Sequence, residues 1–268
     1  MENTNNKLSS DQINALGHLF DEVSQRQLDD FGNISASSKS DGSLITSCDL
    51  WSDRKIVQGL SRIVPGEGVL SEEGDKSIPS SEAYWIVDPL DGTTNFAAGI
   101  PYWSISVARF VHGIPETSFL IIPTLRKKFT AIRQKGVYLN NKKIFKDNNL
   151  QKSDCVSLCS RSIKILQINP REIFPGKIRL LGVSSLNLTS VAMGQTFGAI
   201  ESTPKIWDIA AAWLILDELN CKINWLKTNP ENLNSGEDLS QVNFPLIAGR
   251  TNEKLSLLKP WGDLLLKK

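Results

Sequence analysis

Residues 85–96 of the chain read Trp85-Ile86-Val87-Asp88-Pro89-Leu90-Asp91-Gly92-Thr93-Thr94-Asn95-Phe96, an apolar run that leads directly into two carboxylates and a glycine–threonine pair. The run from Tyr84 to Val87 has no helical gaps and is partly β-branched, which predicts a buried strand that ends at Asp88. Functional groups of α/β sheets collect at the carboxyl ends of strands. The stretch therefore predicts a functional site at the end of a central strand.

The acidic part of this stretch has the chemistry of a metal and phosphate site. Pro89 fixes its own φ and Gly92 permits any φ, so the chain is expected to turn and to direct Asp88 and Asp91 to one point. Mg²⁺ prefers such oxygen ligands, and the Leu90 carbonyl could join them. After Gly92 a helix is expected to begin, and free N–H groups at a helix start bind phosphate. The alternative is a surface β-turn whose acidic residues serve turn chemistry alone.

The segment from Asp88 to Phe96 resembles the central signature of the inositol monophosphatase family, Asp-Pro-(Leu/Ile)-Asp-Gly-Thr-x-Asn-Phe. Two further motifs of that family have similar counterparts in the chain. Upstream, Gly68-Val69-Leu70-Ser71-Glu72-Glu73-Gly74 is a short apolar run that ends in two glutamates. Downstream, Trp207-Asp208 opens an apolar helical segment. This co-occurrence argues against an isolated surface turn.

A further element, from Ser38 to Asp49, resembles the family's lysine loop, which is followed by a strand and an aspartate. Each flanking element also has an ordinary explanation when it is taken alone. The two glutamates fit a solvated acidic loop, and Lys39 fits a solvated loop lysine. Asp49 and Asp208 fit helix N-caps. Only the combination with the central signature predicts a site.

The resemblance implies a Mg²⁺-dependent phosphomonoesterase that uses a metal-activated water and forms no covalent phosphoenzyme. One Mg²⁺ is expected at Glu72, Asp88 and the Leu90 carbonyl, and a second at Asp88, Asp91 and Asp208, with a third, weaker ion near Glu72. Lithium inhibition is expected as well. The implied site residues are Asp49, Glu72 and Thr93 for catalysis, with Asp49 orienting Thr93 and Thr93 holding the water; Glu72, Asp88, Leu90, Asp91 and Asp208 for metal binding; and Lys39, Gly92, Thr93, Thr94 and Glu201 for phosphate or substrate binding.

The substrate depends on residues around these metals. Glu201 lies seven positions before Asp208, as does the family's acidic residue that hydrogen-bonds inositol hydroxyls. Its alternative role is a rim charge that ends a strand. Relatives that act on nucleotide bisphosphates or histidinol phosphate often carry Lys or Arg after Asp-Gly-Thr, whereas this chain has Thr94. Inositol monophosphate or a similar small polyol phosphate is therefore favoured, and fructose bisphosphate and histidinol phosphate stay open.

The chain departs from the family pattern beside the Asp208 helix. Ala212 stands where glycine is usual, and Glu218-Leu219-Asn220-Cys221 replaces Glu-Ala-Gly-Gly. Asn220 can adopt the left-handed conformation that ends a helix, so the architecture is expected to survive. The departures leave the substrate less defined.

The residues present disfavour two other classes of function. A regulatory binding module that lost turnover would be free to lose Thr93, Asp49 or Glu72, and all three are present. A haloacid-dehalogenase-type phosphatase needs an Asp-x-Asp nucleophile motif, but two residues separate Asp88 from Asp91.

Composition and net charge limit the classes of partner that the chain is expected to bind. The chain has 268 residues, 40% of them hydrophobic, and a formal net charge of +1, which gives no case for nucleic acid or membrane binding. The longest apolar run, Ile209 to Leu216, is too short to span a bilayer. The segment from Met1 to Asn6 is polar and lacks a signal-peptide core, so a cytoplasmic enzyme with reduced cysteines is expected. By resemblance, it is expected to be a homodimer.

Apolar residues at helical spacing from Ile13 to Val23 and from Ile56 to Ile63 predict two helices, the second of which is stopped by Pro65-Gly66. The strands that follow, up to a turn at Asn140-Asn141, predict an antiparallel meander, and beyond about Lys146 strands and helices alternate. Together with the family resemblance, this order implies an α+β and α/β layered sandwich of αβαβα order, the sugar-phosphatase fold. Residues 1–146 are expected to form an α+β subdomain with an antiparallel sheet and most metal ligands. Residues 147–268 are expected to form an α/β subdomain that contributes Glu201 and Asp208. The site should then lie in the cleft between the two.

Overall fold

The computed structural model describes residues 7–39, 42, 44–146 and 153–267. The N-terminal segment from Met1 to Asn6 and three residues of the lysine loop, at positions 40, 41 and 43, lie outside the described residues. The expected subdomain boundary, between residues 146 and 147, borders a further segment outside them, at 147–152, so this division stays a prediction.

The first half of the chain contains a long run of consecutive strands, and strands and helices alternate in the second half. The helices are α1 (Ser10–Asp30), α2 (Ser47–Ile63), α3 (Thr93–Ala97), α4 (Lys164–Ile168), α5 (Ser184–Ala192), α6 (Ile206–Glu218) and α7 (Asn252–Asp263). A seven-stranded sheet contains, in spatial order, β3 (Gly68–Ser71), β4 (Ala83–Asp91), β5 (Ser104–Val111), β6 (Ile114–Ile122), β7 (Lys127–Ile132), β8 (Gly136–Leu139) and β9 (Lys142–Ile144). A five-stranded sheet contains β11 (Lys177–Arg179), β10 (Cys155–Leu158), β12 (Gly198–Glu201), β14 (Leu246–Gly249) and β13 (Lys222–Trp225), and a small hairpin contains β1 (Ala36–Ser38) and β2 (Leu44–Thr46).

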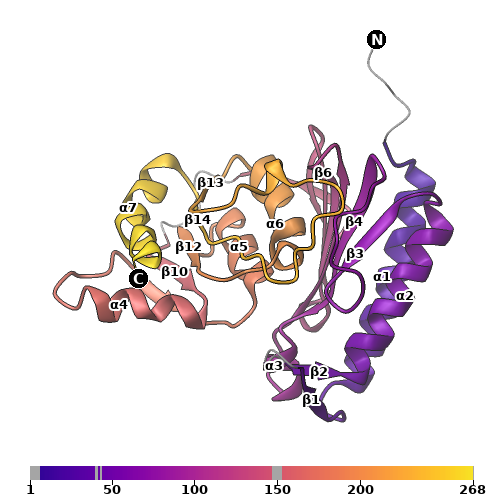
Figure 1. Ribbon diagram of the computed structural model, residues 1–268, viewed down its shortest axis with the longest axis horizontal. Coiled ribbons are helices and arrows are strands. Elements are labelled where there is room, and N and C mark those ends of the chain that lie inside the picture. Colours follow the sequence, from indigo (N-terminus) through magenta and orange to yellow (C-terminus); the bar gives the residue numbers. More distant parts are fainter. Residues whose placement is uncertain (1–6, 40–41, 43, 147–152, 268) are drawn as a thin grey trace.

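The elements stack in five layers of αβαβα order (Figure 1). Helices α1 and α2 cover one face of the seven-stranded sheet, and α5 and α6 lie between the two sheets. Helices α4 and α7 cover the outer face of the five-stranded sheet. Each of the two outer interfaces contains its own cluster of buried apolar side chains, and one larger cluster fills both inner interfaces around α5 and α6. The predicted layered sandwich is confirmed.

The outer helix pair follows the predicted apolar stripes. In α1, Leu16, Phe20 and Val23 are fully buried against the sheet. Helix α1 begins with a capping box in which Ser9 and Gln12 exchange side-chain and backbone hydrogen bonds. Helix α2 ends at Ile63, two residues before the proline that was expected to stop it.

The strands from β4 to β9 form the predicted antiparallel meander. Asn140 and Asn141 connect β8 to β9 with φ values of 48° and 66°, as a tight hairpin turn requires. Only β3 joins this sheet in parallel, beside β4. The carboxyl ends of β3 and β4 therefore lie at one edge of the sheet, which brings Glu72 near the end of β4.

Helix α6 is apolar all round because it lies between two sheets. Its residues from Ile209 to Leu216, including Ala212, are buried. Asn220, just beyond its end, has φ 54°, the left-handed conformation predicted there. In the described part of the chain, no helix has both the length and the apolar character needed to cross a membrane.

The prediction for the end of the central strand was wrong in one respect. Strand β4 does not end at Asp88 with a turn at Pro89 but continues to Asp91. Its register pairs Asp88 with Ser106 and Asp91 with Ser104, so Pro89 and Leu90 form a β-bulge. A bulge tolerates proline because the extra residue needs no ladder hydrogen bond. The two aspartates therefore converge through a bulge rather than through a turn.

Candidate active site

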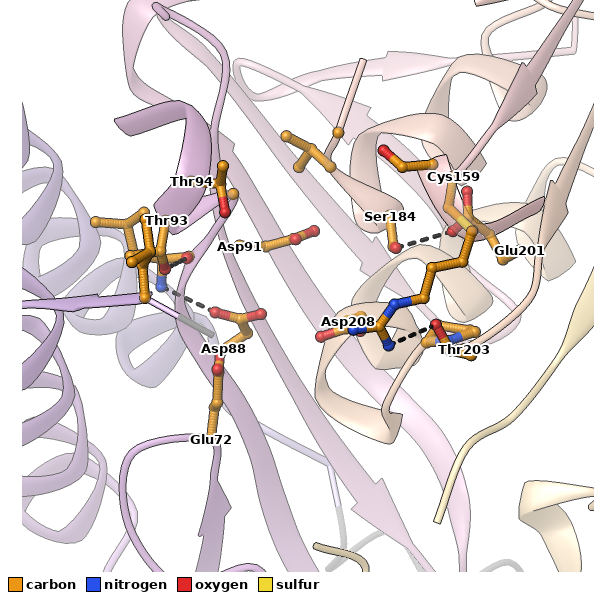
Figure 2. A pocket seen from close by; sticks show the side chains of 18 residues that line it. Glu72, Asp88, Asp91, Thr93, Thr94, Cys159, Ser184, Glu201, Thr203 and Asp208 are labelled. Atoms are coloured by element: carbon orange, nitrogen blue, oxygen red, sulfur yellow. Dashed lines mark hydrogen bonds between the residues drawn. The ribbon is translucent and has the colours of Figure 1, made fainter. Parts of the chain in front are cut away.

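A cavity of about 320 Å³ opens where the bulge of β4 meets the other half of the chain. Figure 2 shows Asp88 and Asp91 on one side of it and Asp208, Ser184 and Glu201 on the other. Its walls come from both sheets and from the first residues of three helices. The lining residues are Leu44, Glu72, Asp88, Leu90, Asp91, Gly92, Thr93, Thr94, Cys159, Ser160, Arg161, Gly182, Val183, Ser184, Glu201, Thr203, Pro204 and Asp208.

Three carboxylates meet at the centre of this cavity. One oxygen from each of Asp88, Asp91 and Asp208 lies within 4.8 Å of the other two, a group that stands out among the described residues. Burial and repulsion from neighbouring carboxylates raise the pKa of Asp88 and of Asp208 well above the usual value, and burial raises that of Asp91 to about 6. Such a set is poorly stable on its own and fits a hard divalent cation. The predicted second ligand set is thus brought together.

A backbone N–H group orients each of these carboxylates. Leu90 N–H donates to Asp88 Oδ1 at 2.9 Å, and Ser185 N–H donates to Asp91 Oδ2 at 2.8 Å. Lys205 N–H donates to Asp208 Oδ2 at 2.8 Å. Asp208 is the third residue of α6 and not its N-cap, which is Lys205. Backbone donors thus hold all three carboxylates in place: the donors to Asp88 and Asp208 are close in sequence, whereas the donor to Asp91 comes from α5.

Thr93, at the start of α3, is tied to Asp49. Its hydroxyl oxygen lies 2.8 Å from Asp49 Oδ1 and 3.2 Å from the Leu90 carbonyl oxygen, and it can donate its proton to only one of them at a time. Asp49 is itself fixed, because Thr46 N–H donates to its Oδ2 at 2.8 Å. Asp49 is the third residue of α2, and Thr46 is the N-cap. The N-cap alternative for Asp49 is therefore wrong.

Gly92 and Thr94 complete this wall of the cavity. Gly92 is the N-cap of α3 with φ 105°, and a Cβ atom there would lie 2.8 Å from a Val183 side-chain carbon. Both the backbone conformation and the close packing therefore require glycine. The predicted helix after Gly92 is confirmed.

Glu72 lies at the cavity wall but outside the three-carboxylate group. Its Oε1 atom accepts a hydrogen bond from Lys39 Nζ at 2.9 Å, and the same ammonium lies 2.5 Å from Glu73 Oε1. Burial lowers the pKa of Lys39, but the two glutamates outweigh burial and raise it. Within the described residues Lys39 does not line the cavity; it forms ion pairs with both glutamates.

Glu201 ends β12 at the far side of the cavity and is fully buried. Ser184 Oγ donates to its Oε2 at 2.9 Å, and Asn187 Nδ2 donates to its Oε1 at 2.8 Å. Burial raises the pKa of Glu201 to about 7, against the lowering effect of these two donors. The alternative of an exposed rim charge is wrong.

The sequence predicts no role for several residues in or beside the cavity. Ser184 lines the cavity and Ser185 donates to Asp91; together they open α5, and a serine pair before an apolar segment is a helix-start signal. Cys159 lies 3.2 Å from Ser202 Oγ through its sulfur, and Arg161 Nη1 donates to Thr203 Oγ1 at 3.2 Å. Nothing in the sequence around Cys159 or Arg161 marks them as cavity residues.

The raised carboxyl pKa values predict a pH-dependent stability of the metal-free protein. Between about pH 4 and pH 7 the folded state binds more protons than the unfolded state, because Asp91 and Glu201 have pKa values of about 6 and about 7 instead of 3.8 and 4.5. Stability should therefore fall as the pH rises through this window. We expect a lower Tm in EDTA at pH 8 than at pH 5.5, and a larger rise in Tm on adding Mg²⁺ at pH 8.

The matched control for this measurement is Asp208→Asn, which removes one of the crowded charges and should shrink the difference in Tm between the two pH values. A wild-type Tm in EDTA that is equal or higher at pH 8 would contradict the expectation.

Comparison with known proteins identifies relatives along most of the chain. The sequence profile of the inositol monophosphatase family matches residues 8–254. The chain is 30% identical to the Nus factor SuhB of Pasteurella multocida (strain Pm70), over 72% of this chain and 76% of that protein. It is 29% identical to the inositol-1-monophosphatase of Mesorhizobium japonicum, over 86% of this chain and 88% of that protein.

Solved structures agree with these matches. The extragenic suppressor protein suhB from Bartonella henselae superposes with a TM-score of 0.78 and 28% identity, covering 97% of this chain and 99% of that one. An IMPase/NADP phosphatase, whose crystal structure is complexed with Mg²⁺ and phosphate, superposes with a TM-score of 0.75 and 25% identity, covering 92% and 95%.

Proposed function

Because the chain belongs to the inositol monophosphatase family, we propose that it is a Mg²⁺-dependent phosphomonoesterase that hydrolyses inositol monophosphate or a similar small polyol phosphate. The observation that carries this proposal is the convergence of Asp88, Asp91 and Asp208 beside the hydrogen-bonded pair of Thr93 and Asp49. The first three supply cation ligands, and the pair supplies a fixed hydroxyl.

The carboxylates fit divalent cations by charge as well as by chemistry. Together with Glu72 they bring four negative charges to the cavity, which two Mg²⁺ ions would balance. Asp88, Asp91 and Asp208 would hold one ion, and Glu72, Asp88 and the Leu90 carbonyl the other, with a third, weaker ion near Glu72. The Mg²⁺ found with phosphate in a solved relative supports the choice of metal. Bound Mg²⁺ supplies a Lewis acid that polarises the phosphate and lowers the pKa of water.

Thr93 would place the attacking water. When its hydroxyl donates to Asp49 Oδ1, its oxygen is left as an acceptor for one O–H of a water molecule. That contact leaves a lone pair of the water free to point at phosphorus. Asp49 fixes the direction of the Thr93 hydroxyl, because Asp49 is itself held by the Thr46 N–H. The first N–H groups of α3 have no partner within the helix and can bind the phosphate oxygens, as can the hydroxyl of Thr94.

The far side of the cavity would recognise the alcohol part of the substrate. Glu201 is a buried acceptor, so it favours ligands that donate hydrogen bonds, as the hydroxyls of a polyol do. Arg161 is exposed at the rim and keeps a second class open, because its guanidinium could bind the second phosphate of fructose bisphosphate. Histidinol phosphate is the third candidate substrate.

A second candidate role is that of a binding factor. The relative from Pasteurella multocida is called a Nus factor, which favours a regulatory function that uses the fold without turnover.

The phosphatase proposal has further parts. They are inhibition by Li⁺, a homodimeric cytoplasmic enzyme, and the division into subdomains 1–146 and 147–268.

The test is phosphate release from inositol, fructose, histidinol and nucleotide phosphates, with Mg²⁺, with Mg²⁺ and Li⁺, and with EDTA. We expect Mg²⁺-dependent, Li⁺-sensitive release that is fastest with the inositol ester. A Glu201→Gln protein should raise KM for that ester and leave KM unchanged for p-nitrophenyl phosphate, which has no hydroxyl to donate. Release from none of the esters, by a folded protein that binds Mg²⁺, would favour the binding role.

A further inference from the structure

Gln27 is a buried polar residue in the helix layer behind the catalytic sheet. It lies in α1, which contributes no residue to the cavity, and its side chain has no exposed surface. A fully buried amide is normally matched by hydrogen bonds to fixed partners. The partners of Gln27 come from three separate segments of the chain.

One of these partners is the backbone of the bulge itself. Gln27 Nε2 donates to the Pro89 carbonyl oxygen at 2.8 Å. Pro89 is one of the two residues that the β4–β5 register skips, between Asp88 and Asp91. Its carbonyl therefore takes a side-chain donor from another layer.

The other two contacts fix the orientation of the amide. Trp103 Nε1 donates to Gln27 Oε1 at 3.0 Å, and Gln27 Nε2 lies 3.2 Å from Ser52 Oγ. The indole can only donate, so the amide oxygen must face it and the amide nitrogen must face Pro89. Trp103 also packs in one apolar cluster with Leu90, the second skipped residue.

The remaining polar groups of the bulge are held by the site residues. Leu90 N–H donates to Asp88 Oδ1, and the Leu90 carbonyl oxygen lies 3.2 Å from the Thr93 hydroxyl. Among the described residues, Gln27 is thus the one hydrogen-bond partner of the bulge backbone that does not line the cavity. We propose that Gln27 is a positioning residue for the metal site, which sets the convergence of Asp88 and Asp91 by holding the Pro89 carbonyl.

This inference rests on the proposed metal ligands, and its test measures binding of Mg²⁺ alone by titration calorimetry, without substrate. In Gln27→Met, a side chain of similar length replaces the amide and removes all three contacts. We expect Mg²⁺ affinity to fall by about 10-fold or more, which is the usual effect of losing a group that orients metal ligands. A folded Gln27→Met protein with wild-type Mg²⁺ affinity overturns the inference.

The matched control is Ser52→Ala, which removes another partner of the same amide but leaves the Pro89 contact. It should bind Mg²⁺ as the wild type does, and the Tm of both variants in EDTA separates loss of stability from loss of affinity. If Ser52→Ala weakens Mg²⁺ binding as much as Gln27→Met, the effect is general loosening and the inference fails.

Gln27→Glu keeps the shape and tests the donor directly, even if Gln27→Met does not fold. The introduced carboxyl can donate to the Pro89 carbonyl only while it is protonated. The ratio of wild-type to variant Mg²⁺ affinity should therefore rise with pH, and a constant ratio overturns the inference. A wild-type protein that binds no Mg²⁺ would instead overturn the proposed metal site.

Discussion

Asp91→Asn is expected to lower phosphate release by more than about 100-fold, because losing even a group that only orients a metal ligand costs about 10–100-fold and Asp91 is a proposed ligand. The substitution keeps the shape of the side chain. The amide oxygen would accept the hydrogen bond from Ser185 N–H that Asp91 Oδ2 accepts now. The amide NH₂ group would then face Asp88 and Asp208, where it cannot bind a cation.

Two measurements check this expectation: the rate of phosphate release at saturating Mg²⁺ and the affinity for Mg²⁺ by calorimetry. Both should fall together, while the Tm in EDTA should not decrease, since one buried charge is removed. Asp263→Asn, an exposed aspartate at the end of α7, is the matched control and should retain full activity. Full hydrolysis by Asp91→Asn would show that the metal site is assigned wrongly.

Thr93→Val should lower kcat by about 10²–10⁴-fold, the range expected when a group that directs proton transfer and attack is lost. Valine has the shape of threonine without the hydroxyl, so it can hold no water and cannot bond to Asp49. The proposed Mg²⁺ ligands and the backbone N–H groups of α3 are unchanged. We therefore expect KM and Mg²⁺ affinity close to the wild-type values.

Steady-state kinetics and calorimetry separate these quantities. Asp49→Asn should give a smaller fall in kcat, because the Thr93 hydroxyl keeps the Leu90 carbonyl as a partner at 3.2 Å. Thr130→Val, on β7 outside the cavity, is the matched control for loss of a hydroxyl. An unchanged kcat in Thr93→Val would remove Thr93 from the mechanism and leave water placement to the metals.

Local signals in the sequence were sufficient for much of the architecture. The stripes of α1 and α2, the turn at Asn140 and the left-handed Asn220 each depend on residues close along the chain, and the structure confirms them. The metal-ligand candidates were recognised by family resemblance, and the structure brings Asp88 and Asp91 together with Asp208.

What the sequence could not show depends on distant contacts. Pro89 followed by an aspartate and a glycine is typical of a turn, and only the neighbouring β5 makes it a bulge within a longer strand. In the sequence Gln27 looks like any other polar residue of a helix, because its distinguishing contact is with the Pro89 carbonyl, 62 positions away. The contact of Ser185 with Asp91 spans 94 positions and has no local signature.

The three central carboxylates come from β4 and α6, two elements that belong to different halves of the sequence. A cation held between them would act as a reversible cross-link that joins the first half of the chain to the second. Such a link can form only after both halves have folded and docked, so it would add little to the rate of folding. It would instead slow unfolding, and metal would protect the native protein kinetically.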